Sequence, residues 1–418
     1  MAKYRDLLKE RDFIFYSAGQ LISQFGDRLV QIILIGLIYK ISPGSTMELA
    51  KALSFTLVPA FFVSPLAGVW VDRWNNKKTM IICDILRSSL VFTLPVFLAT
   101  GQITPVYIAI FCIFTCACFF LPAKFAIIPD LVPKEKLLLA NSLSTIVTVV
   151  GGVAGITIGG LILEIIDIKK TIYLNSFVYL VSAISLSFIV YKSKKGMKEK
   201  TGIVGEKIKE ALKTSFLYEL IEGLRYLVQE RRVRFVIFVL FLVMSMVGAI
   251  YVVSVIFIQD IMGSITRDIG LFGFFLCLGL LLGSYFYGKK GHSMSKDSAI
   301  YASLLASGVF VGLFAVCLSA TASFFLGSLI AFFAGMAAAP VMISANTIIH
   351  EDIDDSMRGR IFSSLGIVMN LGLLIFMLIA SSLAEVVGKI WILLTCGVIF
   401  GGFGLAGLVL NRRGRPDR

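Results

Sequence analysis

Charged residues are scarce in this sequence. Asp, Glu, Lys and Arg make up 16% of its 418 residues, whereas soluble proteins carry about 25%. Only two histidines are present, and the acidic run that starts at His350 lacks the second histidine of a zinc-protease motif. With 57% hydrophobic residues, this balance excludes a disordered chain, a coiled coil and an ordinary cytosolic enzyme. It predicts a polytopic membrane protein.

Three further features are missing. No Gly-Lys-Ser/Thr follows any glycine cluster, so ATP is not expected to be the energy source. The N-terminus lacks the cleavage site of a signal peptide, and we expect the first apolar run to be retained as a helix. The cysteines offer neither a disulfide framework nor zinc-ligand spacing, and they are interpreted as packing residues: Cys83, Cys112, Cys116, Cys118, Cys277, Cys317 and Cys396.

Long apolar runs are abundant instead. A helix needs about 20 mostly apolar residues to cross the hydrocarbon core of a bilayer. Twelve runs of this kind are present, six on each side of a polar gap: 13–40, 49–71, 79–100, 104–127, 138–166, 170–191, 233–259, 268–288, 298–319, 321–348, 361–386 and 388–410.

Basic residues favour one side of these runs. If the N-terminus is cytosolic, 30 of the 39 Lys and Arg residues lie in cytosolic segments and six in the opposite loops. The positive-inside rule therefore places both termini in the cytosol and predicts a multi-pass protein of the plasma membrane, of the bacterial inner-membrane type. Because the basic residues lie between apolar runs, the net charge of +13 indicates a lipid bilayer rather than nucleic acid as the partner.

The polar gap divides the chain into two similar parts. We expect an N-terminal six-helix bundle over 1–191, a basic cytosolic linker with an amphipathic helix over 192–232, and a C-terminal six-helix bundle over 233–418. Pro122 and Pro340 lie at matching positions in the fourth helix of each bundle, which suggests a duplication. A duplicated bundle of this kind holds its substrate near the bilayer midplane, at the interface of its halves.

Asp27 is the sharpest candidate for chemistry. An aspartate inside a spanning helix costs about 2.5–3.5 kcal/mol on insertion scales, so it must face protein or water. Gln20, Gln24 and Gln31 share its helix face. This stripe predicts a cavity wall where Asp27 contacts substrate or carries a coupling proton. The structural alternative is that Arg28, or another helix, simply pairs with the carboxylate.

Asp84 and Arg87 lie three residues apart in the third run. They are able to pair with each other or to reach Lys124 in the fourth run, which is expected at a similar depth. A fixed structural ion pair is the first interpretation. A gating network that forms and breaks between transport states is the second.

A loop after the second run resembles a known signature. Gly68, Asp72, Arg73, Lys77 and Lys78 stand at the spacing of the loop between helices 2 and 3 of the major facilitator superfamily. Further segments resemble its branch of macrolide-efflux, siderophore-export and lysophospholipid-transport proteins: Gln24–Asp27, Asp84–Arg87, Pro129–Pro133, Ala140–Ser142 and Arg358–Ser363.

The resemblance implies an all-α membrane fold with twelve helices in two pseudo-symmetric six-helix bundles. It also implies a conformational latch, formed by the loop residues together with Arg358, Gly359 and Arg360. The alternative for the basic residues is positive-inside anchoring, and Gly68 is expected to allow close helix approach. The glycines of helix 5 resemble the family's antiporter motif: Gly151, Gly155, Gly159 and Gly160. Ile156 stands where that motif usually has a proline.

We therefore expect a secondary transporter that exports amphiphilic small molecules by alternating access and proton antiport. The nearest alternative is a lysophospholipid or other lipid transporter that works without protons. A membrane-embedded enzyme would need convergent nucleophiles, bases or metal ligands within the spans, and only Asp27 and the Asp84/Arg87 pair are present there. A non-transporting receptor or scaffold with the same fold is a further alternative, and it should tolerate Asp27→Asn. We expect a monomer whose partners are the substrate and the lipid bilayer. No cofactor is expected, since the proton gradient is the energy source.

Overall fold

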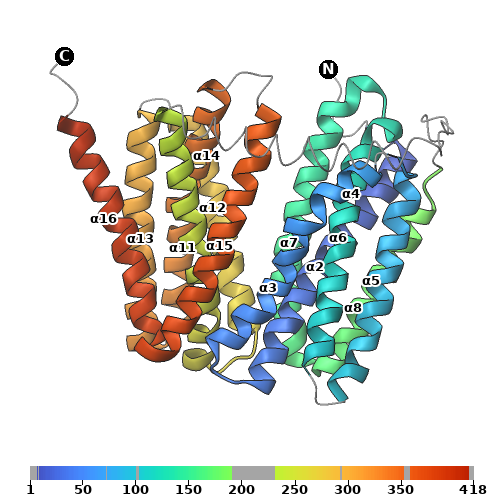
Figure 1. Ribbon diagram of the computed structural model, residues 1–418, viewed down its shortest axis with the longest axis horizontal. Helices are drawn as coiled ribbons and strands as arrows, with labels where there is room; N and C mark the ends of the chain where they lie inside the picture. Colours follow the sequence, from blue (N-terminus) through green and yellow to red (C-terminus); the bar gives the residue numbers. More distant parts are fainter. Residues whose placement is uncertain are drawn as a thin grey trace. The chain divides into compact units, whose positions relative to one another are not determined.

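The computed structural model describes residues 7, 9–71, 73–99, 103–190, 231–291, 294–352 and 358–413. The described chain is helical throughout, apart from short turns (Figure 1). The expected linker helix within 192–232 lies outside the described residues, apart from the first residues of α11. Two compact units are present, and each one is described by itself.

The first unit contains six helical segments. Its elements are α2 (Arg11–Ile41), α3 (Thr46–Phe62) with α4 (Ser64–Val71), α5 (Asn76–Ala99), α6 (Thr104–Leu131), η1 (Lys134–Lys136) with α7 (Leu137–Ile165), and α8 (Ile168–Ser187).

The described part of the second unit also contains six helices. They are α11 (Arg231–Met262), α12 (Arg267–Lys290), α13 (Lys296–Thr321), α14 (Phe324–Asp352), α15 (Arg358–Val387) and α16 (Lys389–Arg413).

Each unit includes one short segment from the half of the sequence that forms most of the other unit. Residues Gly44–Ala50, which begin α3, group with the second unit, and residues Ile265–Gly270, which begin α12, group with the first. In each unit a carboxylate accepts a backbone N–H from this short segment. Glu385 accepts the N–H of Met47 at 3.0 Å, and Glu164 accepts the N–H of Ile265 at 3.0 Å.

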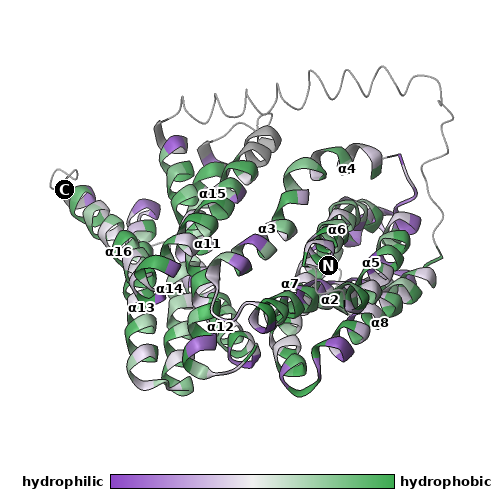
Figure 2. Cartoon of the chain, turned by 60° about the horizontal axis from the view of Figure 1, so that its bottom comes forward, coloured by the Kyte–Doolittle hydropathy of each residue, from purple (hydrophilic) through white to green (hydrophobic). Residues whose placement is uncertain are grey.

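Ten of these helices are long and apolar enough to cross a membrane. Hydrophobic residues, coloured green, predominate along the helix ribbons in Figure 2. The two other expected spans are α8, which has 20 residues, and the second run. The second run is broken at Val63 into α3 and α4. The sequence analysis expected an unbroken run over 49–71. Pro65 has no N–H to donate, and a proline in a helix interior kinks or ends it, which accounts for the break.

The internal repeat is visible in the packing of each unit. In the first unit α2 packs against α7 and α8, while α5 packs against α6 and α8. In the second unit α11 packs against α15 and α16, while α13 packs against α14 and α16. Each pair in one unit corresponds to the pair six helices later. The repeated prolines, Pro122 and Pro340, lie in α6 and α14, the fourth helix of each unit.

Glycines allow the helices of the second unit to pack closely. A Cβ at Gly308 on α13 would lie 2.5 Å from the carbonyl oxygen of Gly397 on α16, and one at Gly397 would lie 2.8 Å from the carbonyl oxygen of Gly308. The two backbones therefore touch directly, which is the packing that small residues give to membrane helices. The turn after α15 is made by Gly388, whose φ of 98° favours glycine.

Candidate functional site

A buried cluster of charges lies where α2, α5 and α8 meet in the first unit. Asp27 comes from α2, Asp84 and Arg87 come from α5, and Tyr179 comes from α8. Gly26 makes room for α8, since a Cβ there would lie 3.1 Å from the ring of Tyr179. The glycine beside the aspartate therefore sets how closely the two helices approach.

Arg87 is the centre of this cluster. Its side chain is fully enclosed, with Nη1 2.6 Å from Asp27 Oδ1 and Nη2 2.6 Å from Asp84 Oδ1. The guanidinium carbon also lies over the rings of Phe120 and Tyr179, at 4.5 and 5.0 Å from their centroids. One cation is thus shared between two carboxylates and held between two aromatic faces, an arrangement that arginine suits better than lysine.

The two aspartates have different surroundings. Asp84 is fully enclosed and accepts two hydroxyl hydrogen bonds, from Ser182 at 2.6 Å and from Ser23 at 3.1 Å. Asp27 keeps 20% of its side chain exposed and accepts one hydroxyl hydrogen bond, from Tyr179 at 2.7 Å. Asp84 is therefore fixed by partners on every side, whereas Asp27 is the carboxylate that water or a ligand reaches.

A second set of polar side chains connects α2 with α6 and α7. Lys124 on α6 is almost completely enclosed, and its Nζ donates to Thr148 Oγ1 at 3.0 Å. Gln20 donates to Thr148 at 2.5 Å and accepts from Ser144 at 2.9 Å, which joins α2 to α7. Among the described side chains, none brings a carboxylate to within ion-pair distance of Lys124. The lysine is stabilised instead by the neutral hydroxyl of Thr148 and by the ring of Phe125, whose centroid lies 4.9 Å from Nζ.

Together the two groups are electrically balanced. Asp27 and Asp84 carry two negative charges when ionised, and Arg87 and Lys124 carry two positive charges. A balanced set is expected within a membrane, where an unpaired charge is costly. Arg87 contacts both carboxylates, so Asp84 alone is enough to give this buried arginine an ion-pair partner.

The remaining residues of the predicted stripe lie apart from this cluster. Arg28 donates to Gln31 at 2.9 Å, one turn further along α2, and the described structure shows it in no ion pair with Asp27. The structural partner of Asp27 is therefore on another helix, Arg87 of α5, and is not its neighbour Arg28. Gln24 faces α7, because a Cβ on Gly151 would lie 3.0 Å from its Cβ. The stripe is therefore divided between two helix contacts.

Three residues that donate hydrogen bonds to the two aspartates were not predicted from the sequence. Tyr179, Ser182 and Ser23 complete the shells of the two aspartates. A signal for the first two is present in the sequence, since α8 carries polar residues at three- and four-residue spacing, which places them on one helix face: Asn175, Ser176, Tyr179, Ser182 and Ser185.

The predicted latch is only partly visible. Asp72 lies outside the described residues, and Arg358, Gly359 and Arg360 begin α15, with side chains outside the described part. Lys77 donates to the carbonyl oxygens of Ser187 and Ile189 at 2.8 and 2.7 Å, so it caps the end of α8.

The other members of the loop are exposed or open. Arg73 and Lys78 are exposed. The close helix approach expected at Gly68 is not seen among the described residues, none of which would lie within 4 Å of a Cβ there.

The glycines of α7 do form a close helix contact. A Cβ on Gly151 would lie 2.9 Å from the carbonyl oxygen of Leu21, and one on Gly155 would lie 2.8 Å from that of Phe25. Gly159 continues the same face against Leu29, while Gly160 lies against the 265–270 segment. The motif therefore brings α7 against the helix that carries Asp27.

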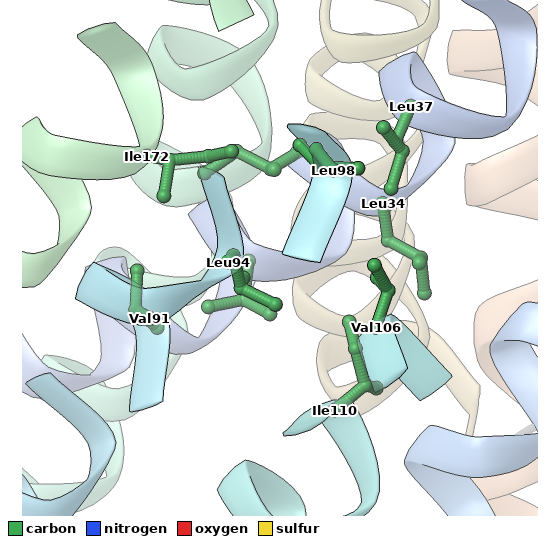
Figure 3. Close-up of a pocket in the computed structure, with 10 residues that line it drawn as sticks. Leu34, Leu37, Val91, Leu94, Leu98, Val106, Ile110 and Ile172 are labelled. Carbon is green, nitrogen blue, oxygen red and sulfur yellow. The ribbon is translucent and has the colours of Figure 1, made fainter. Parts of the chain in front are cut away.

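A small apolar cavity lies at another level of the first unit (Figure 3). Leu34, Leu94, Val106 and Ile172 are among the side chains that point into it, and its volume is about 10 Å³. A space of this size holds no more than about one water molecule. It is a packing gap between helices and not a substrate site.

This arrangement defines a class of protein: a polytopic membrane protein built from two repeated helical units, with an ionisable cluster inside one of them. The sequence model of the Major Facilitator Superfamily matches residues 16–316. The chain belongs to this superfamily, and it is a membrane transporter of a small-molecule substrate and not an enzyme.

The similar proteins agree with this assignment. Macrolide efflux protein A of Streptococcus pyogenes is 23% identical over 397 residues, which cover 91% of this chain and 92% of that protein. Macrolide efflux protein A of Enterococcus faecalis is 24% identical over 79% of this chain and 98% of its own length.

A solved structure shows the same fold. A bacterial homologue of the iron transporter ferroportin, in an inward-facing state, has a TM-score of 0.73 with 16% sequence identity. The match covers 95% of this chain and 98% of that one. The fold is therefore the twelve-helix fold of the superfamily, as the sequence predicted.

Proposed function

We propose that this transporter exports amphiphilic organic molecules from a bacterial cell, and that protons entering through Asp27 drive the export. It acts in the plasma membrane as a monomer, with both termini in the cytosol and no bound cofactor. The observation that carries the proposal is the contrast between Asp27 and Asp84. Both contact Arg87, but only Asp27 has an exposed fraction. The macrolide efflux proteins among the relatives support the substrate class.

The contacts of Asp27 suggest how a proton is coupled to movement. When Asp27 is ionised, its Oδ1 holds Arg87 of α5 and Tyr179 of α8. Protonation removes the negative charge and weakens both contacts, because hydrogen bonds to charged groups are about twice as strong as neutral ones. Arg87 remains on Asp84, so α2 loses its charged contact with α5 and its bond to Tyr179 of α8, while the hydrogen bond from Ser23 of α2 to Asp84 is kept. The helices α5 and α8 stay joined through Ser182. Proton binding thereby loosens one helix contact in the first unit.

The test is uptake into everted membrane vesicles that contain the protein. A fluorescent amphiphilic cation, a macrolide and a labelled lysophospholipid are supplied separately, with and without an uncoupler. We expect accumulation of the drug or macrolide that collapses with the uncoupler and is lost in Asp27→Asn. The matched control is Asp260→Asn, which removes a half-exposed acid paired with Lys389 in the second unit and is expected to retain accumulation.

A second measurement separates coupling from binding. In Asp27→Asn, exchange of labelled for unlabelled substrate across the vesicle membrane should continue, because exchange requires no net proton movement. Loss of exchange together with accumulation would contradict the coupling role and make Asp27 a substrate contact or a structural residue. Lipid movement that ignores the uncoupler would overturn the antiport proposal in favour of a lipid transporter.

A further inference from the structure

A groove on the first unit lies between the start of α5 and the middle of α6. Its volume is about 580 Å³, which is within the range of about 300–1,000 Å³ that small-molecule sites occupy. Ile82 and Leu86 of α5 form one wall, and Thr115 and Phe119 of α6 form the other. Trp74 and Lys78 lie at the end of the groove where α5 begins.

The groove is apolar along its length and positively charged at one end. Ile82 and Leu86 are 53% and 48% exposed, although they lie on a helix that crosses the membrane. Side chains of this kind face lipid chains in a bilayer. Lys78 is exposed, and the described structure shows no partner for its Nζ, in contrast to the neighbouring Lys77, which caps α8. The groove therefore matches an amphiphile with an acyl chain and an anionic head.

The aromatic residues place the charged end at the level of lipid headgroups. Trp74 stacks on Phe119 with ring centroids 5.8 Å apart, and Trp70 lies 5.7 Å from Trp74. Tryptophan is enriched at the membrane–water interface, where its ring lies among the headgroups. Lys78 and Trp74 are thus suited to contact a phosphate and the polar region around it.

A hydroxyl group deeper in the groove lacks a partner. The Oγ1 atom of Thr115 is buried, and no residue in the described part of the chain makes a hydrogen bond with it. Thr115 lies one helical turn, about 6 Å, from Phe119 at the aromatic end. A buried hydroxyl without a partner is costly, so rotation of this side chain towards an acceptor bound at this depth of the groove is favoured. The ester carbonyl of a glycerophospholipid lies below its phosphate and supplies such an acceptor.

We propose that this groove binds an anionic glycerophospholipid of the cytosolic leaflet as a structural lipid distinct from the transported substrate. Lys78 contacts the phosphate of the headgroup, and Trp74 packs beside it. Thr115 donates to an ester carbonyl, and one acyl chain lies along Ile82 and Leu86. The binding of this lipid is independent of the coupling role proposed for Asp27.

Fluorescence quenching by brominated lipids tests this site. Trp70→Phe and Trp391→Phe are combined so that Trp74 is the only tryptophan, and the protein is reconstituted with phosphatidylglycerol or phosphatidylcholine brominated on the acyl chain. We expect stronger quenching by phosphatidylglycerol at equal mole fraction. Because a basic residue near a membrane surface contributes about 1 kcal/mol towards an anionic lipid, Lys78→Gln should reduce the preference about fivefold.

Two variants make the result specific. Lys289→Gln removes an exposed lysine at the end of α12 in the second unit and should leave the preference unchanged. Thr115→Phe fills the groove and should reduce quenching by both lipids, while the unfolding midpoint shows that the variant remains folded. Equal quenching by the two lipids in the parent protein, or an unchanged preference in Lys78→Gln, would overturn the proposal.

Discussion

Removing the cation from the buried cluster gives the most demanding test of its energetics. Arg87→Met keeps a long side chain between Phe120 and Tyr179 but deletes both ion pairs. Asp84 is then fully enclosed without a cationic partner, although Ser23 and Ser182 still donate to it. Removing one member of a buried ion pair costs about 3–5 kcal/mol, because the other charge stays buried. We expect a loss of this size in the free energy of unfolding.

A second substitution should recover part of the loss. In the double variant Arg87→Met/Asp84→Leu, the remaining charges are Asp27 and Lys124, so the cluster is again balanced. Replacing a buried ion pair by apolar residues of similar size is often neutral or stabilising. The double variant should therefore be more stable than the sum of the two single losses predicts, by about 1–3 kcal/mol.

The assay is reversible unfolding by dodecyl sulfate in mixed micelles, followed by tryptophan fluorescence. Trp70 and Trp74 report on the first unit, and Trp391→Phe removes the reporter in the second. Arg28→Met is the matched control, since Arg28 bonds only to Gln31 in the described structure, and its loss should stay below about 1 kcal/mol. A loss below 1 kcal/mol for Arg87→Met, or simple additivity in the double variant, would refute the ion-pair reasoning.

Three further predictions use the same unfolding assay. Gly155→Ala should cost about 1–3 kcal/mol, because its Cβ would lie 2.8 Å from the carbonyl oxygen of Phe25, whereas Gly152→Ala, which meets only Arg28 Nε at 3.7 Å, should be neutral or slightly stabilising. Lys77→Gln should cost about 1–2 kcal/mol through loss of the α8 cap, and Lys78→Gln less than about 0.5 kcal/mol; equal effects would contradict the capping role. Asp167 caps α8, and the Lys169 N–H that it accepts, together with Lys40, holds its pKa below the usual range. Its contribution is therefore present above the ordinary carboxyl pKa and lost as the pH falls through the lower folded-state value. Asp167→Ala should cost about 0.5–2 kcal/mol at pH 7, and a difference from the parent that persists unchanged in strong acid would contradict this.

The fold was predictable because the features that determine it lie within short stretches of the sequence. Runs of apolar residues and the side on which Lys and Arg fall are both properties of short windows, and they predict helices and their order. The break at Val63 also has a local cause in Pro65. What the sequence did not give was the pairing of distant residues. Asp84 and Arg87 are three residues apart and were paired correctly, but Asp27 was matched to its neighbour Arg28 as readily as to a distant helix.

The contact between Asp27 and Arg87 depends on how α2 rotates against α5, and no short window records that rotation. Gly26 and Tyr179 set it, since the glycine lets the tyrosine ring approach α2 closely enough to hold the carboxylate. Tyr179 lies 152 residues away from Asp27 along the chain. The outcome at Gly68 has the same origin. A glycine permits close packing but does not require it, so only the arrangement of the neighbouring helices decides.

The two units show which properties a duplication keeps and which it changes. Their helix pairs correspond one to one, so the packing has been preserved. The charges have not. Asp84, Arg87 and Lys124 are enclosed in the first half. In the described part of the second half, the enclosed charged side chain is Asp268 at the start of α12, which groups with the first unit, and the other enclosed polar side chains are uncharged, among them Ser245, Gln259 and Ser381. Packing depends on small residues and apolar surfaces, which tolerate many sequences, but a buried charge persists only when its partners are retained together. A proton-coupling site is therefore expected in one unit alone, and substitutions that abolish coupling should concentrate on α2, α5 and α8.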